Sequence, residues 1–212
     1  MKKLHTMRRE YDVGALLEQT MEADPMAMFA RWLEEAIAAE IDEPNAMTIA
    51  TATPDGSPSA RVVLLKEMRG DGFIFFTNYL SRKGRELENN PRAALLFDWH
   101  PMARQVRIEG GVEQLSPEES DAYYNSRPEN ARIGAWSSPQ SRVVRDRAEL
   151  DALQREVEQR FAQEALPRPI HWGGYLVRPT MIEFWQGRPD RMHDRLVYIK
   201  TEEGWSLNRL AP

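Results

Sequence analysis

Cationic side chains stand beside apolar stretches at several separate places in the chain. Residues 61–66 (RVVLLK) put Arg61 and Lys66 at the two ends of an expected strand. Side chains alternate along a strand, so these two residues, five positions apart, are expected on opposite faces unless a bulge intervenes. The alternative is an ordinary half-buried strand with solvated charges at its ends.

A second basic group, residues 81–84 (SRKG), stands where a helix is expected to begin. Arg82 and Lys83 would then lie in the first helical turn, where basic side chains oppose the helix dipole. An anion bound at the free backbone N–H groups would explain both charges. An ordinary basic surface turn is the alternative.

Residues 191–195 (RMHDR) form a third group. If this segment is extended, Arg191, His193 and Arg195 share one face and Asp194 points away. Adjacent cations repel one another unless an anion lies among them. A solvated loop explains the same segment without a ligand.

The fourth group is Tyr123, Ser126 and Arg127, at the end of an expected helix. Hydroxyl and guanidinium groups together suit a phosphate, although a plain helix terminus has the same composition. Four further residues, whose type alone does not show whether they belong to a binding site, are Gln105, Gln140, Ser141 and Trp185. Four phosphate-compatible groups in a chain of net charge -5 indicate one or two phosphorylated ligands.

Composition excludes several other classes of protein. The 212 residues include no cysteine, which rules out disulfides, thiolate metal sites and a cysteine nucleophile. The 4 histidines lack ligand spacing, so no metal site is expected. Glycine-rich phosphate loops and a Gly-x-Ser-x-Gly elbow are absent. The acidic balance disfavours nucleic-acid and membrane-surface binding. Without a secretory leader or a long apolar run, a cytoplasmic location is expected.

Helix and strand signals then define the elements that must position these residues. Residues 1–23 are predicted to form a mobile arm, and residues 24–212 the folded domain. Helices are expected from Asp24-Pro25, from Ser81 to Glu88, from Ser116 to a point before Pro128, and around residues 150–161. Strands are expected at 46–53, 60–66, 73–77, 93–99, 105–114, 175–177, 181–186, 196–200 and 205–210. The pattern predicts an α+β protein, mainly β, with an antiparallel sheet that closes on itself and helices outside it.

Ten segments, in order along the chain, resemble the pyridoxamine 5′-phosphate oxidase family. They are residues 61–66 (RVVLLK), 76–83 (FTNYLSRK), 88–92 (ENNPR), 104–106 (RQV), 126–128 (SRP), 133–136 (IGAW), 172–174 (WGG), 183–187 (EFWQG), 191–195 (RMHDR) and 208–212 (NRLAP). Residues 8–11 (RREY) also match an N-terminal arm that the family can fold over its site.

The resemblance implies an FMN-binding split β-barrel and a homodimer with FMN at the subunit interface. By position, the residues implied to contact FMN are Arg61, Val62, Val63, Leu64, Lys66, Phe76, Thr77, Arg82, Lys83, Gln105, Gln140, Ser141, Trp185 and Arg195. Those implied to contact the substrate are Lys66, Tyr123, Arg127, Arg191, His193, Arg8 and Tyr11, with Arg191 and His193 at the reacting ring. The implied reaction oxidises pyridoxamine or pyridoxine 5′-phosphate to pyridoxal 5′-phosphate by hydride transfer to flavin, and O2 becomes H2O2.

Two positions depart from the family pattern. Ala131 stands where the family usually has a serine that binds the substrate phosphate, so weaker substrate binding is expected. Phe76 stands where tyrosine is common. Two other functions stay open: an FMN-dependent reductase with a nicotinamide donor, and a non-catalytic carrier of flavin or pyridoxal phosphate.

Overall fold

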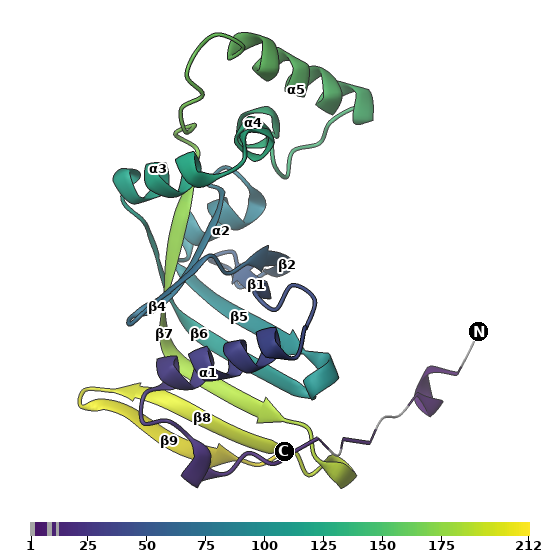
Figure 1. Ribbon diagram of the computed structural model, residues 1–212, viewed down its shortest axis with the longest axis vertical. Coiled ribbons are helices and arrows are strands. Elements are labelled where there is room, and N and C mark those ends of the chain that lie inside the picture. Colours follow the sequence, from purple (N-terminus) through teal and green to yellow (C-terminus); the bar gives the residue numbers. More distant parts are fainter. Residues whose placement is uncertain (1–2, 8–9, 12) are drawn as a thin grey trace. The chain divides into compact units, whose positions relative to one another are not determined.

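The computed structural model describes residues 3–7, 10–11 and 13–212, which form a β-sheet and several helices (Figure 1). The helices are α1 (Pro25–Ala38), α2 (Arg82–Asn89), α3 (Pro117–Ser126), α4 (Glu129–Ser137) and α5 (Arg147–Arg160). Short 3-10 helices are η1 (Leu4–Thr6), η2 (Glu18–Thr20), η3 (His100–Met102) and η4 (Pro189–Arg191). The strands are β1 (Ala46–Ala52), β2 (Pro58–Leu64), β3 (Glu67–Arg69), β4 (Gly72–Asn78), β5 (Arg92–Trp99), β6 (Arg104–Gln114), β7 (Trp172–Gln186), β8 (Asp194–Thr201) and β9 (Gly204–Leu210).

The sheet runs in the order β2-β1-β5-β6-β7-β4-β3, and β9 joins it through β8, which pairs with β7. Within the described residues this path does not return to its start, so the sheet is open where the sequence predicted closure. Strand β7 changes partner along its length: residues up to Val177 pair with β4, and residues from Met181 pair with β8. Pro179 lies between the residues that pair with β4 and those that pair with β8.

The chain divides into two compact units. The first unit contains the described residues of Met1–Ile49 together with Ala94–Gly110 and Pro179–Pro212. The second unit contains Ala50–Ala93 and Gly111–Arg178. Each unit has a buried core of its own, and the candidate site residues are divided between them.

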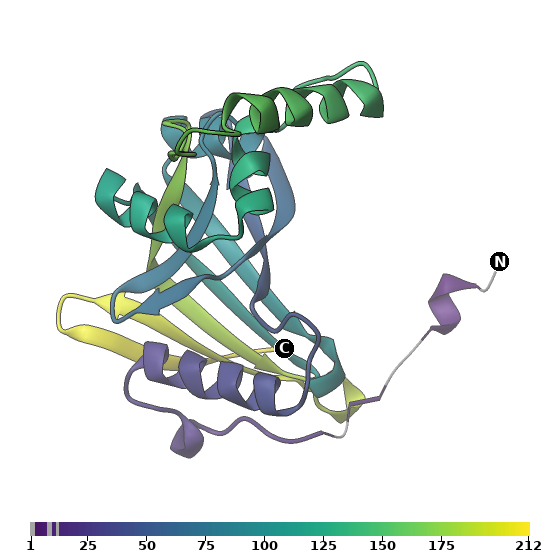
Figure 2. The same cartoon turned by 45° about the horizontal axis from the view of Figure 1, so that its top comes forward.

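In the first unit, helix α1 packs its apolar stripe against the sheet (Figure 2). The ring of Phe29 lies 4.8 Å from that of Phe97, and the ring of Trp32 lies 5.1 Å from that of Phe184, measured between centroids. Asp24 accepts a hydrogen bond from the N–H of Met26 and caps the helix as the sequence predicted. Burial of these rings, together with Met26, Met28 and Ala36, holds α1 in place.

In the second unit, β4 is a nearly continuous apolar strand paired with the first half of β7. Helices α3, α4 and α5 gather where β7 begins (Figure 1). Ser116 and Glu119 form the predicted capping box of α3. Helix α4 was not predicted: Pro128 precedes it, no side chain caps it, and Gly134 lies inside it.

One further expectation from the sequence was wrong, and the extended conformation considered for residues 191–195 is not found. The separate strands at 175–177 and 181–186 are parts of the single strand β7. The segment 191–195 is not extended throughout, because Asp190 and Arg191 have φ angles of 53° and 60° in the left-handed region. Within the described residues, no helix is both long and apolar enough to cross a lipid bilayer.

Candidate cofactor and substrate sites

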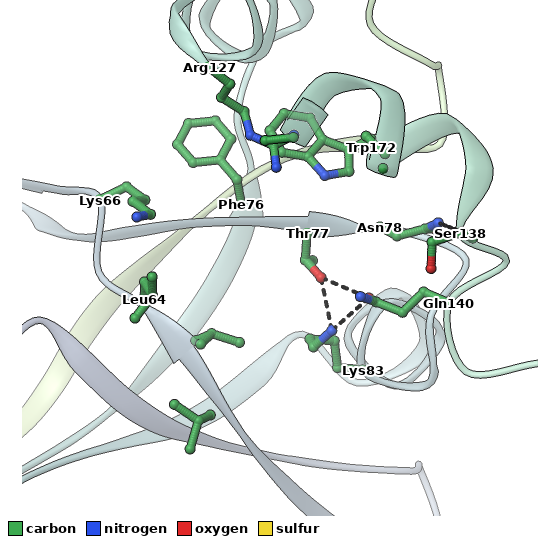
Figure 3. Close-up of a pocket in the computed structure, with 15 residues that line it drawn as sticks. Leu64, Lys66, Phe76, Thr77, Asn78, Lys83, Arg127, Ser138, Gln140 and Trp172 are labelled. Carbon is green, nitrogen blue, oxygen red and sulfur yellow. Dashed lines mark hydrogen bonds between the residues drawn. The ribbon is translucent and has the colours of Figure 1, made fainter. Parts of the chain in front are cut away.

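A cavity of about 450 Å³ lies in the second unit (Figure 3). This volume is within the range of sites that hold a cofactor or a small-molecule ligand. The predicted residues that line it are Val62, Val63, Leu64, Lys66, Phe76, Thr77, Lys83, Arg127 and Gln140. Ala131, the residue that departs from the family pattern, also lines the cavity. Five further lining residues were not singled out from the sequence: Asn78, Gly134, Ala135, Ser138 and Trp172.

Strand β4 sends two neighbouring side chains to opposite sides of the cavity, as alternation requires (Figure 3). Phe76 points toward Trp172 and Arg127, whereas Thr77 points toward Lys83 and Gln140. The cavity therefore has two differently built ends, each with its own cation.

At one end, the ammonium group of Lys83 is held by neutral oxygens. Its Nζ donates to Thr77 Oγ1 at 2.8 Å and to Gln140 Oε1 at 3.0 Å. The lysine is only 7% exposed, and the described residues contain no carboxylate that forms an ion pair with it. Burial, helped by the positive charge of Arg61, lowers the pKa of Lys83 to about 8. An anionic ligand would remove this electrostatic penalty.

Local structure fixes Lys83 at the start of α2. Ser81 caps the helix by accepting a hydrogen bond from the N–H of Gly84. Gly84 is required there, because a Cβ would lie 1.9 Å from the carbonyl oxygen of Tyr79. Gln140 reaches Lys83 from the loop after α4, where the next residue, Ser141, has a φ of 68°. Ser141 itself does not line the cavity.

At the other end, Arg127 follows α3 and lies over Trp172, with Cζ 4.6 Å from the ring centroid. Its NH1 nitrogen is buried and has no hydrogen-bond partner among the described residues. Burial lowers the pKa of the guanidinium group from its ordinary value. Nearby, the ring of Tyr123 stacks on that of Phe76 with centroids 3.8 Å apart. An unpartnered donor beside an aromatic wall fits a bound oxyanion.

Arg61 and Arg82 do not line the cavity. Both contact the buried carboxylate of Glu86 instead: Arg82 Nε lies 2.8 Å from Oε1, and Arg61 NH2 lies 3.5 Å from Oε2. Lys66 lines the cavity, but it lies beyond the end of β2, so the predicted alternation along one strand does not extend to it.

A second cavity, of about 530 Å³, lies in the first unit. Its lining residues are Met7, Glu10, Tyr11, Arg188, Asp190, Arg191 and His193. Arg191 and His193 are thus brought together as predicted. Nδ1 of His193 accepts a hydrogen bond from the backbone N–H of Arg188 at 3.1 Å, so a proton on the neutral ring is at Nε2.

The rings of Tyr11, Trp185 and His193 form a cluster in which Tyr11 meets the other two rings edge to face. Tyr11 lies 5.8 Å from Trp185 and 5.7 Å from His193, and its ring approaches Gly187 so closely that a Cβ there would lie 2.7 Å from Cγ. Arg8, the other predicted residue of the arm, lies outside the described residues.

Arg195 does not line the second cavity, which corrects the expectation that it shares a face with Arg191 and His193. It lies in β8 and forms a two-point ion pair with the buried Glu183, at 2.8 and 3.2 Å. The left-handed backbone at Arg191 breaks the two-residue alternation on which the expectation rested. Gln105 is half-buried in β6, in the same unit.

The open sheet with helices is of the split-barrel class. A pyridoxamine 5′-phosphate oxidase-related, FMN-binding protein from Nostoc punctiforme shares this fold, with a TM-score of 0.71 at 16% identity over 91% of this chain and 100% of that one. Residues 33–163 match the family model described as pyridoxamine 5′-phosphate oxidase. Residues 172–212 match the pyridoxine 5′-phosphate oxidase C-terminal dimerisation region. The chain belongs to the pyridoxamine 5′-phosphate oxidase family.

Full-length relatives agree with this assignment. Proteins named pyridoxine/pyridoxamine 5′-phosphate oxidase are 56% identical in Bordetella petrii, over 97% of this chain and 98% of the relative, and 54% identical in Salinibacter ruber, over the whole of both chains. The crystal structure of PhzG from Burkholderia lata, in complex with tetrahydrophenazine-1-carboxylic acid, is similar with a TM-score of 0.88 at 34% identity, over 94% of this chain and 99% of that one.

Proposed function

We propose that the protein is an FMN-dependent oxidase that converts pyridoxamine 5′-phosphate and pyridoxine 5′-phosphate to pyridoxal 5′-phosphate. One observation carries the proposal: two cations, Lys83 and Arg127, border a single cavity and form no ion pair with a carboxylate in the described part of the chain. Two phosphorylated ligands, cofactor and substrate, would supply the missing anions. The names of the relatives at 52–56% identity support the same substrates.

Lys83, with Thr77 and Gln140, would hold the phosphate of FMN. Arg61 and Arg82 would add to the positive potential at the same end, since the charge of Arg61 already acts on Lys83. Val62, Val63, Leu64 and Phe76 would supply the apolar wall. The donor set of this chain therefore fits the cofactor.

The substrate phosphate would lie at the other end, bound by Arg127 together with Lys66 and the hydroxyl of Tyr123. Arg191 and His193 of the first unit would contact the pyridine ring, and Gln105, Trp185 and Arg195 would contribute to the flavin site. We propose that they do so from the partner subunit of a homodimer, which the match of residues 172–212 to a dimerisation region supports. A cytoplasmic location completes the proposal.

When bound, FMN would supply hydride-accepting chemistry, with O2 as the final acceptor and H2O2 as the product. The alcohol substrate would lose its hydroxyl proton as it becomes the aldehyde, and the imine formed from the amine substrate would be hydrolysed by water with release of ammonia. The residues of this chain would act by position. Fixing the phosphate at Arg127 and Lys66 uses binding energy remote from the reacting carbon to align it. Arg191 would cover the pyridine ring and limit its rotation. No side chain in either cavity has to act as a general base for this step.

A visible spectrum and a product assay test the proposal directly. The purified protein is expected to be yellow and to form pyridoxal 5′-phosphate from both substrates in air without NADH. A requirement for NADH would favour the reductase instead. A yellow protein that forms no product would favour the carrier, which the departure at Ala131 favours slightly.

A further inference from the structure

Glu86 is an acidic residue of the second unit that lies between the cations Arg61 and Arg82. Its side chain is 4% exposed and lies in α2, one turn after Arg82. Burial raises the pKa of its carboxyl group, but the hydrogen bonds that it accepts outweigh this effect and lower the pKa to about 2. The group is therefore ionised at neutral pH, and it lies beside the cations Arg61 and Arg82.

Two hydroxyl groups connect this carboxylate to Arg61. Thr51 Oγ1 and Ser59 Oγ both donate to Glu86 Oε2, at 2.5 and 2.6 Å. The same two oxygens accept hydrogen bonds from the guanidinium group of Arg61. Because each hydroxyl group donates its hydrogen bond to the carboxylate, only the lone pairs of the two hydroxyl oxygens remain to accept hydrogen bonds from Arg61.

Arg82 contacts Glu86 directly and still has N–H donors that are not used in this contact. Its Nε donates to Glu86 Oε1 at 2.8 Å, whereas its two terminal nitrogens have no hydrogen-bond partner in the part of the chain that the structure describes. The side chain is 58% exposed, so solvent or a ligand can reach those nitrogens. The pair of terminal N–H groups suits two-point binding of a phosphate.

From these contacts we infer that Glu86 is a positioning residue for phosphate binding, which holds Arg61 and Arg82 in fixed orientation next to Lys83. The inference rests on the proposed function, because it takes the phosphate of FMN as the ligand. One buried anion among three cations leaves a net positive charge for that phosphate. Preset guanidinium groups lose less conformational entropy when the phosphate binds.

Binding of FMN and of riboflavin, which lacks the phosphate, tests this role without an activity assay. Dissociation constants of the apo-protein are measured by quenching of flavin fluorescence. We expect Glu86→Gln to weaken FMN binding by about ten- to a hundredfold and to leave riboflavin binding nearly unchanged. Glu88→Gln, which removes the same charge from an exposed position of the same helix, is the matched control and should leave both constants unchanged.

The opposite outcomes are distinct. A wild-type chain that binds FMN no better than riboflavin would overturn the proposed function and the inference together. A wild-type preference for FMN that Glu86→Gln retains, or strengthens through loss of a repulsive charge, would overturn the inference alone. An equal loss for both flavins would show a merely structural role and would also overturn it.

If Glu86→Gln does not fold, the variant Ser59→Ala tests the same role of Glu86. This variant removes one hydroxyl link between Glu86 and Arg61 and leaves no buried charge unpaired. A loss of the FMN preference by a factor of about three to ten supports the inference, and an unchanged preference contradicts it.

Discussion

The guanidinium group of Arg127 lies over the indole ring of Trp172, 4.6 Å from its centroid, and leaves a buried NH1 nitrogen without a partner among the described residues. Trp172 is itself buried against Tyr124 and Ala135, so its ring orientation is fixed by the core. The aromatic face thus holds the arginine at the cavity without using its hydrogen-bond donors.

Replacing Trp172 with phenylalanine should weaken this support. A cation–π contact contributes about 0.5–2 kcal/mol, so we expect Trp172→Phe to raise the KM for pyridoxamine 5′-phosphate about two- to thirtyfold with little change in kcat or in FMN affinity. Trp136→Phe is the control. Cζ of Arg160 lies 5.3 Å from the ring centroid of Trp136, but Trp136 does not line the cavity. Equal effects of the two variants would contradict this role for Trp172.

The lowered pKa of Lys83 predicts a pH dependence of cofactor binding. The ammonium group must be charged to bind a phosphate, and its pKa in the free protein falls from 10.5 to about 8. FMN affinity should therefore be nearly constant around pH 7, begin to fall as the pH approaches 8, and fall by up to about tenfold per pH unit well above pH 8. In Lys83→Arg the side chain stays charged over this range, so the FMN dissociation constant should vary much less between pH 7 and 9.5. Riboflavin titrations show whether the effect belongs to the phosphate.

Arg191 and His193 border the same cavity but should differ in importance. Hydride transfer needs little acid–base assistance in the proposed reaction, whereas it does need a correctly placed ring. We expect the rate of flavin reduction in a single turnover to fall more in Arg191→Ala than in His193→Ala. Equal losses in the two variants would show that the ranking is wrong.

Ala131 lines the cavity together with Arg127, where a hydroxyl group could donate to the substrate phosphate. Ala131→Ser should restore one hydrogen bond, which is worth about 0.5–1.5 kcal/mol. The KM for pyridoxamine 5′-phosphate should then fall about two- to tenfold, while kcat changes little. A KM that stays the same or rises would mean that the substrate phosphate does not lie beside this position.

Local signals in the sequence predicted much of the fold. Asp24, Ser81 and Ser116 each cap the helix that they were expected to begin, because a cap depends on residues only two or three positions away. Helix α4 lacks such a cap, and it was missed. The continuous strand β7 was divided at Pro179, because the sequence does not show that a strand changes partner there.

The sequence by itself determined the types of the chemical groups and, through ten ordered segments, the family. Tertiary structure decided which groups meet. Trp172 comes to Arg127 from 45 positions along the chain, and Glu86 meets Thr51 and Ser59 through the packing of α2. The left-handed backbone at Arg191 separated Arg195 from Arg191 and His193, which simple alternation had placed on one face. Such pairings depend on burial and backbone geometry summed over a whole unit, so no local pattern of residues specifies them.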